Sequence, residues 1–120
     1  MNKNTLVLGA SLKIERYSNR AIQTLRKHNI TTQAVGLREG EVNDVKINTG
    51  KPAYLDIDTV TLYLNPKRQK DYYDYIIALN PNRVIFNPGT ENPELMTLLR
   101  QNNIEFEVAC TLVLLATAQY

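Results

Sequence analysis

The sequence predicts an α/β protein built on a three-layer, doubly wound parallel sheet of about five strands. Two observations carry this prediction. Short apolar runs rich in β-branched residues alternate with segments of helical periodicity, and most of these runs end at a glycine or at a helix-capping asparagine. Right-handed crossovers then place helices on both faces of the sheet and leave a ligand crevice where the strand order reverses. We expect the strand order 3-2-1-4-5.

Length and composition favour a single domain over residues 1–120. The hydrophobic fraction of 43% and the charged fraction of 22% are those of an ordinary globular protein. The sequence has no apolar run of bilayer-spanning length, and its polar start at Met1–Asn4 does not resemble a signal peptide. One cysteine, Cys110, cannot form an internal disulfide. We therefore expect a cytoplasmic protein with no membrane partner.

The net charge of +2 is unevenly distributed along the chain. Residues 1–51 carry nine Lys or Arg against four Asp or Glu, whereas residues 52–120 carry five against eight. A duplex usually requires a stripe of basic residues across one face. The basic first half instead suits a small polyanionic ligand, and we expect no nucleic-acid partner.

The first strand, turn and helix form the expected ligand site. Thr5–Leu8 has the pattern of a buried parallel strand, Gly9-Ala10-Ser11 forms a turn, and Ser18 is the predicted N-cap of a helix that ends near Asn29. Phosphates bind at such turns because the helix that follows presents unpaired N–H groups. Gly9 removes a Cβ from the approach and Ser11 adds a hydroxyl. Three basic residues follow: Lys13, Arg16 and Arg20. The alternative is an ordinary strand–loop–helix with surface charges.

The remaining elements follow from periodicity and capping. His28 lies in the last turn of the first helix and is interpreted as a surface cap. Residues 37–56 have weak periodicity, which predicts an irregular hairpin or an extra edge strand. The other strands are predicted at Thr31–Val35, Ile57–Leu64, Arg83–Phe86 and Ile104–Val108. The other helices are predicted at Pro66–Leu79, from Pro93 to Asn102, and at Leu112–Ala118, with Asn65-Pro66 and Asn92-Pro93 as helix starts. The order 3-2-1-4-5 would place the Gly9 and Asn87–Thr90 loops side by side.

The turn after the first strand is not a dinucleotide fingerprint. The segment from Gly9 reads G-A-S-L-K-I, which has one glycine where G-x-G-x-x-G requires three. Arg38 follows the second strand in Gly36-Leu37-Arg38-Glu39, where an arginine favours a phosphate on the adenosine ribose. NADP and coenzyme A (CoA) are the ligands that fit.

Three motifs together carry a family resemblance. They are Leu8-Gly9-Ala10-Ser11 with Arg16–Arg20, Asn87–Asn92, and Ala109-Cys110-Thr111-Leu112. The chain resembles the small stand-alone CoA-binding domain proteins of bacteria, which are similar to the CoA-binding domain of the succinyl-CoA synthetase α chain. The resemblance implies a Rossmann-like fold with CoA over the first β–α turn. Many relatives have Asn-Pro-Lys where this chain has Gly36-Leu37-Arg38, which leaves the target of Arg38 open.

The resemblance also assigns roles. Gly9, Ala10 and Ser11 would cradle the pyrophosphate, and Ser18, Asn19 and Arg20 would supply donors at the helix start. Together with the residue patterns, it gives the expected CoA contacts: Gly9, Ala10, Ser11, Arg16, Ser18, Asn19, Arg20, Gly36, Arg38, Asn65, Asn87, Pro88, Gly89, Thr90 and Cys110.

The sequence offers little for catalysis. Glu91 and Glu94 flank a helix start and are interpreted as helix-stabilising acids, and Cys and His do not cluster at metal-ligand spacing. Cys110 is a reactive candidate that could form a mixed disulfide with CoA, or it is a buried structural cysteine. We expect no enzyme activity and no metal. The synthetase relatives use a phosphohistidine from a region that this sequence does not include.

We therefore predict non-catalytic binding of CoA or acyl-CoA by a carrier, sensor or regulatory subunit. The alternative is an NADP-binding reductase or redox-sensor domain, and a third interpretation is an interaction module with a vestigial crevice. The sequence leaves open the acyl group and whether the partner is a second copy of the chain or an enzyme.

Overall fold

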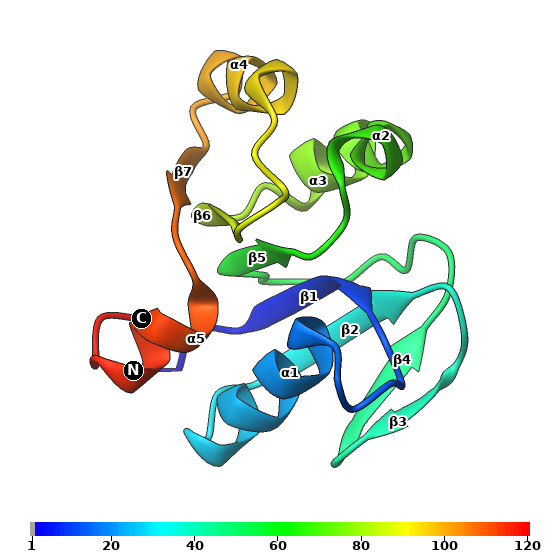
Figure 1. Cartoon of the computed structure of the whole chain (residues 1–120). Helices are drawn as coiled ribbons and strands as arrows, with labels where there is room; N and C mark the ends of the chain where they lie inside the picture. Colours follow the sequence, from blue (N-terminus) through cyan, green and yellow to red (C-terminus); the bar gives the residue numbers. More distant parts are fainter. Residues whose placement is uncertain (1) are drawn as a thin grey trace.

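The computed structural model describes residues 2–120, which form a three-layer α/β structure (Figure 1). Its sheet has seven strands within those residues, in the order β3-β4-β2-β1-β5-β6-β7. Their bounds are β1 Thr5–Ala10, β2 Thr32–Gly36, β3 Gly40–Val42, β4 Val45–Asn48, β5 Thr59–Leu62, β6 Arg83–Phe86 and β7 Glu105–Val108. The β3–β4 pair is antiparallel and each other neighbouring pair is parallel. The doubly wound class predicted from the sequence is confirmed.

The number and order of strands differ from the prediction. The described residues hold seven strands instead of five, because residues 37–56 contribute the β3–β4 hairpin, which joins the sheet where β4 pairs with β2. The hairpin takes the place beside β2, and β5 pairs with β1. The five predicted strands correspond to β1, β2, β5, β6 and β7. When these are numbered 1 to 5, their order in the sheet is 2-1-3-4-5, so the predicted order 3-2-1-4-5 is wrong. The loop after β5 therefore lies between the Gly9 loop and the Asn87–Thr90 loop.

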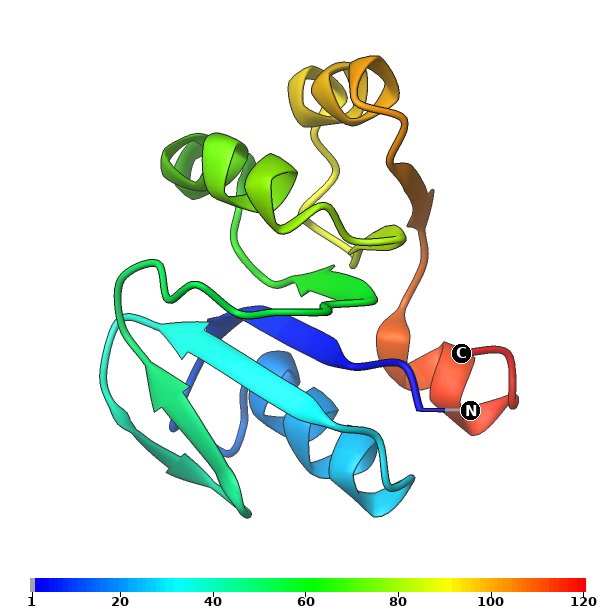
Figure 2. The ribbon, with the colours of Figure 1, turned by 180° about the vertical axis from the view of Figure 1, so that it is seen from behind.

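Helices cover both faces of the sheet (Figures 1 and 2). One face carries α1 (Tyr17–Lys27) and α5 (Thr111–Ala116), and the other carries α2 (Pro66–Gln69), the 3₁₀ turn η1 (Lys70–Tyr72), α3 (Tyr73–Leu79) and α4 (Pro93–Gln101). The predicted single helix from Pro66 to Leu79 is therefore interrupted. Its first turn has a polar sequence and buries Gln69, whose side-chain amide donates to the Leu64 and Thr90 carbonyls. These bonds tie α2 to two loops while α3 packs on the sheet.

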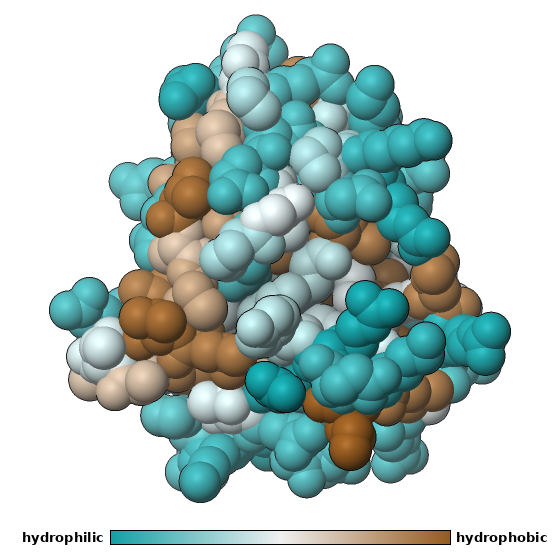
Figure 3. Space-filling model, in the orientation of Figure 1, coloured by the Kyte–Doolittle hydropathy of each residue, from teal (hydrophilic) through white to brown (hydrophobic). Residues whose placement is uncertain are grey.

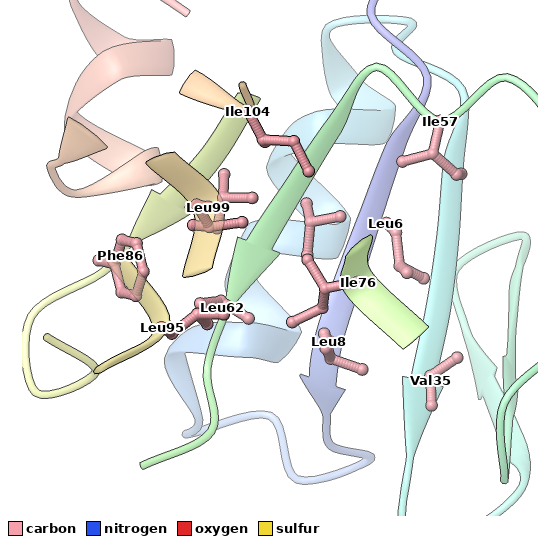
Figure 4. Close-up of a cluster of buried hydrophobic side chains, with 12 residues drawn as sticks. Leu6, Leu8, Val35, Ile57, Leu62, Ile76, Phe86, Leu95, Leu99 and Ile104 are labelled. Atoms are coloured by element: carbon pink, nitrogen blue, oxygen red, sulfur yellow. The ribbon is translucent and has the colours of Figure 1, made fainter. Parts of the chain in front are cut away.

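Two apolar clusters hold the layers together. Figure 4 shows the larger one, in which Ile76 of α3 and Leu95 and Leu99 of α4 pack against strand residues such as Leu8 and Leu62. The second lies on the opposite face and joins α1, α5, β1, β2 and the hairpin. In the described part of the chain, no helix is long and apolar enough to cross a membrane.

The predicted helix caps are mostly confirmed. The Asn65 side chain accepts from the Arg68 amide at 2.9 Å, and the Asn92 side chain accepts from the Glu94 amide at 3.1 Å. His28 is the exposed C-cap of α1. The prediction for Ser18 is wrong, because α1 begins at Tyr17 after Arg16 and Ser18 is buried in its first turn. Backbone bonds in the preceding loop, such as Arg16 N–H to the Lys13 carbonyl, set the start of the helix instead.

Gly36 marks a close backbone approach that we use as a test of the fold. A Cβ at this position would lie 2.2 Å from the Ala10 carbonyl oxygen. We expect Gly36→Ala to lower the free energy of unfolding by about 3 kcal/mol or more, because backbone atoms must move apart. Gly50→Ala is the matched control, since it has open space and only a positive φ of 75°, with an expected cost of about 1–2 kcal/mol. Urea denaturation measures both, and equal losses would contradict the close approach.

Candidate functional site

A groove of about 870 Å³ crosses the carboxyl edge of the sheet over the ends of β2, β1 and β5 and reaches the loop after β6. Its walls also include the start of α1 and the α2–η1 segment. The volume lies within the range of small-ligand sites. A crevice at this edge is where open α/β sheets bind their ligands.

Most of the residues predicted from the sequence meet in this groove. Those that line it are Gly9, Ala10, Ser11, Arg16, Ser18, Gly36, Arg38, Asn65, Pro88, Gly89 and Thr90. Four others are not among the lining residues: Asn19, Arg20, Asn87 and Cys110. The groove also has lining residues that the prediction did not include: Leu12, Lys13, Tyr17, Val35, Leu37, Tyr63, Leu64, Arg68 and Tyr72.

The charge of the groove has one sign. Four basic side chains line it, and all four residues are exposed: Lys13, Arg16, Arg38 and Arg68. Within residues 2–120, the lining set contains no Asp or Glu. Cations gathered at the edge of a sheet and at a helix start create a positive potential that attracts anions. Apolar surface lies beside this charge, since Leu12, Ile14 and Tyr17 are exposed around the β1–α1 loop (Figure 3).

Gly9 also makes a close contact within the protein. Its φ is +100°, and a Cβ there would lie 2.9 Å from the Tyr63 carbonyl carbon and 3.1 Å from the Leu64 side chain. The missing Cβ therefore admits the neighbouring loop after β5. A bulkier residue at position 9 would strain the fold, which makes Gly9 a poor position for a binding test.

The buried Asn19 side chain is hydrogen-bonded to the β1–α1 loop. It is 1% exposed, its amide donates to the Ser11 carbonyl at 2.9 Å, and its oxygen accepts from Gln23 at 2.6 Å. Arg20 stacks on the Tyr17 ring, with its guanidinium carbon 5.5 Å from the ring centroid. In this structure both residues interact with the protein, and Asn19 orients the loop.

Asn87 also serves the fold. Its amide donates to the Thr61 hydroxyl at 2.7 Å and to the Leu62 carbonyl at 2.8 Å, and its oxygen accepts from the Thr111 amide at 2.9 Å. These bonds join β5, β6 and the start of α5. The side chain of Thr90 donates back to the Asn87 carbonyl at 2.7 Å. The Asn87 side chain and the Thr90 hydroxyl therefore already have hydrogen-bond partners within the protein.

Cys110 is a half-buried free thiol at the N-cap of α5. The groove ends at residues of the loops after β5 and β6, and Cys110 is not among its lining residues. The mixed disulfide suggested by the sequence therefore has no support from the shape of the groove.

Tyr63 lines the groove with a protonated phenol. Burial is the main cause that raises its pKa, to about 12, and hydrogen bonding with the Thr111 and Thr61 side chains opposes the shift. Such a group holds its proton at neutral pH and cannot act as a base there. The described residues also contain no group of three or more His, Cys, Asp or Glu side chains placed to hold a metal ion.

Two of the residues missed by sequence analysis were assigned to a strand. Tyr63 and Leu64 end the predicted strand Ile57–Leu64, but β5 ends at Leu62, so both belong to the loop that forms a groove wall. Arg68 follows Asn65, the residue of this segment that was predicted as a contact. Leu12 and Leu37 could not be predicted as groove residues, because the sequence does not show which exposed apolar side chains face the crevice.

The fold and the groove define a Rossmann-like α/β protein with a ligand crevice at the carboxyl edge of its sheet. The chain belongs to the CoA binding domain family, whose model matches residues 3–116. This confirms the family resemblance of the sequence motifs and supports CoA binding in general terms.

Solved structures share the fold. A crystal structure of an uncharacterized protein is 44% identical with a TM-score of 0.97, covering 100% of this chain and 99% of that one. A hypothetical protein from Pyrococcus horikoshii OT3 is 26% identical with a TM-score of 0.80, covering 93% of this chain and 80% of that one. A protein from Thermus thermophilus is 18% identical with a TM-score of 0.85, covering 99% and 91% respectively. No curated protein matches the chain.

The pKa of Tyr63 predicts a loss of stability in alkali. Its folded pKa of about 12 exceeds the value of 10.0 for a free tyrosine, so the folded state holds the proton more tightly. Ionisation of Tyr63 does not change the unfolding free energy below about pH 10, and it lowers that free energy as pH rises from 10 through 12, by about 3 kcal/mol at most. Unfolding free energies of wild type and Tyr63→Phe across this range measure the effect, and Tyr75, whose pKa is also about 12, remains in both. Parallel pH profiles would contradict it.

Proposed function

We propose that this protein binds CoA or an acyl-CoA in the groove and does so without catalysis, as a carrier, sensor or regulatory subunit. The observation that carries the proposal is the charge of the groove. Four basic side chains line it, and its lining residues within residues 2–120 include no carboxylate. CoA has a pyrophosphate and a 3′-phosphate, so its negative charge complements this set. Membership in the CoA binding domain family supports the same ligand.

The proposed pose follows the strand order. Under this proposal, the pyrophosphate lies over Gly9–Ser11 at the start of α1, an eleven-residue helix whose first N–H groups and Arg16 favour an anion. The adenosine lies toward the end of β2, where Arg38 pairs with the 3′-phosphate. The pantetheine arm then runs over the loop after β5 toward Pro88–Thr90.

Two observations support a binding role without chemistry. The groove walls, where residues 2–120 describe them, offer no carboxylate or imidazole, and the Tyr63 phenol keeps its proton. A reducing cytoplasm is part of the proposal, since Cys110 is a free thiol. The partner is a small nucleotide ligand.

An NADP-binding reductase or redox sensor is the second candidate. Arg38 at the end of β2 favours it, because a 2′-phosphate of NADP would reach the same region as the 3′-phosphate of CoA. The turn after β1 has one glycine of the three in the dinucleotide fingerprint, which favours CoA.

Native mass spectrometry and calorimetry test the proposal. Protein purified under native conditions should carry CoA species, and calorimetric titration of the ligand-free protein should give tighter binding for CoA than for NADPH. Tighter binding of NADPH would favour the second candidate, and no binding of either would overturn both.

The Arg38 assignment gives a specific prediction. Arg38→Ala should weaken CoA binding by about 1.5 kcal/mol, the lower end for a charge-assisted hydrogen bond, since Arg38 is exposed. Dephospho-CoA should bind wild type and variant equally, because it lacks the phosphate that Arg38 contacts. Arg100→Ala makes the same charge change on α4 and should leave both affinities unchanged. If Arg38→Ala preferred CoA over dephospho-CoA by the wild-type factor, the assignment would fail.

A further inference from the structure

We infer that the groove prefers CoA thioesters of short apolar acyl groups over free CoA and over thioesters of dicarboxylic acids. This inference rests on the proposed function and goes beyond it by naming the class of acyl group. It comes from a chemical difference between the two ends of the groove. The end of interest, called the acyl end here, lies between the loop after β5 and the loop after β6.

The acyl end presents apolar surface. Its lining side chains are Tyr63, Leu64 and Pro88. Tyr63 and Leu64 are half-buried, and Leu64 packs against the larger apolar cluster. A ligand tail placed on this surface displaces water from carbon atoms, which is favourable for a methylene chain and unfavourable for a charge.

Several polar groups of the loop after β6 already have partners in the protein. The Asn87 side chain bonds to β5 and to the start of α5. The Thr90 hydroxyl and amide both donate to the Asn87 carbonyl, and the Gly89 amide donates to the Glu91 carboxylate at 2.8 Å. A polar acyl group that used one of these engaged groups would have to break its existing bond, whereas an apolar group breaks none.

Gln69 fixes the width of the acyl end. It is 0% exposed, and its amide nitrogen donates to the Leu64 carbonyl and to the Thr90 carbonyl, each at 2.8 Å. Its oxygen accepts from the Asn92 amide at 2.9 Å. One buried side chain thus joins both walls, and the apolar surfaces are held apart before a ligand binds. A preformed apolar slot gains affinity because little ordering is needed on binding.

The opposite end of the groove differs. Arg38 lies there beside Leu37, which is 71% exposed, and Lys13 and Arg16 follow on the β1–α1 loop. These cations are suited to bind the phosphates of the ligand, so its acyl group would lie at the acyl end. Arg68 is a cation near the acyl end, but it is exposed, so a carboxylate that reached it would form a solvent-screened pair of little value.

Calorimetry with a ligand series tests the inference. The ligands are CoA, acetyl-CoA, butyryl-CoA, hexanoyl-CoA and succinyl-CoA. Each buried methylene should raise affinity about twofold to fourfold, so that hexanoyl-CoA, which has four more methylenes, binds roughly 16-fold to 250-fold tighter than acetyl-CoA. Succinyl-CoA should bind no tighter than acetyl-CoA, because its terminal carboxylate would lose water at an apolar wall.

A matched pair of variants locates the effect. Leu64→Asn places a polar group of similar size at the acyl end, and it should bring the hexanoyl-to-acetyl affinity ratio close to one. Leu37→Asn makes the same substitution at the opposite end of the groove and should keep the wild-type ratio. Should Leu64→Asn fail to fold in a thermal melt, Pro88→Ser provides the acyl-end variant, since Pro88 is exposed.

The outcomes separate the two proposals. Failure of CoA and all its thioesters to bind would overturn the proposed function and this inference with it. Binding of CoA with equal affinities across the acyl series would overturn only the inference. A preference for succinyl-CoA would also overturn it and would assign the acyl end to a carboxylate near Arg68.

Discussion

The groove depends on a contact between backbones at the ends of three adjacent strands. The Ala10 carbonyl at the end of β1 occupies the space that a Cβ on Gly36 would need, and the Tyr63 backbone after β5 occupies the corresponding space beside Gly9. These approaches bring the loops after β2, β1 and β5 together into one continuous floor. Because main-chain atoms make the nearest of these contacts, the register of the strands determines how closely the loops approach one another.

Four buried carboxamides then hold the loops on this floor. Asn19 binds the β1–α1 loop, Gln69 joins α2 to the loops after β5 and β6, Asn87 joins β5 to α5, and Asn92 bonds to Gln69 and caps α4. A buried amide without partners would be costly, so these networks are stable only when the loops adopt this arrangement. The buried amides therefore position the walls, and the exposed cations remain available for a ligand.

The sequence predicted the fold class because its central strands are apolar and its helix starts carry asparagine–proline pairs with strong local signals. It also predicted an irregular hairpin or an extra edge strand over residues 37–56, where β3 and β4 lie, but it did not predict that β4 pairs with β2 and β5 with β1. Tyr63 and Leu64 were not predicted as groove residues, because they were assigned to the strand Ile57–Leu64, whereas β5 ends at Leu62. Asn19 and Asn87 were expected to contact a ligand, because a polar residue at a strand end or helix start gives the same sequence signal whether it faces a ligand or a carbonyl. Only the structure distinguishes these cases.

The division between buried amides and exposed cations bears on which ligands such a groove can hold. A single exposed cation gains little from a single anion, because water and salt screen the pair. Lys13, Arg16, Arg38 and Arg68 act in one groove, so a ligand with several phosphates gains from all of them at once while a simple anion does not. The apolar wall at Leu64 and Pro88 contributes a term that salt does not weaken. A ligand that joins phosphates to an apolar tail gains from both the charged and the apolar part of the groove. The distance between these two parts then determines how long the segment between the phosphates and the tail of the ligand must be.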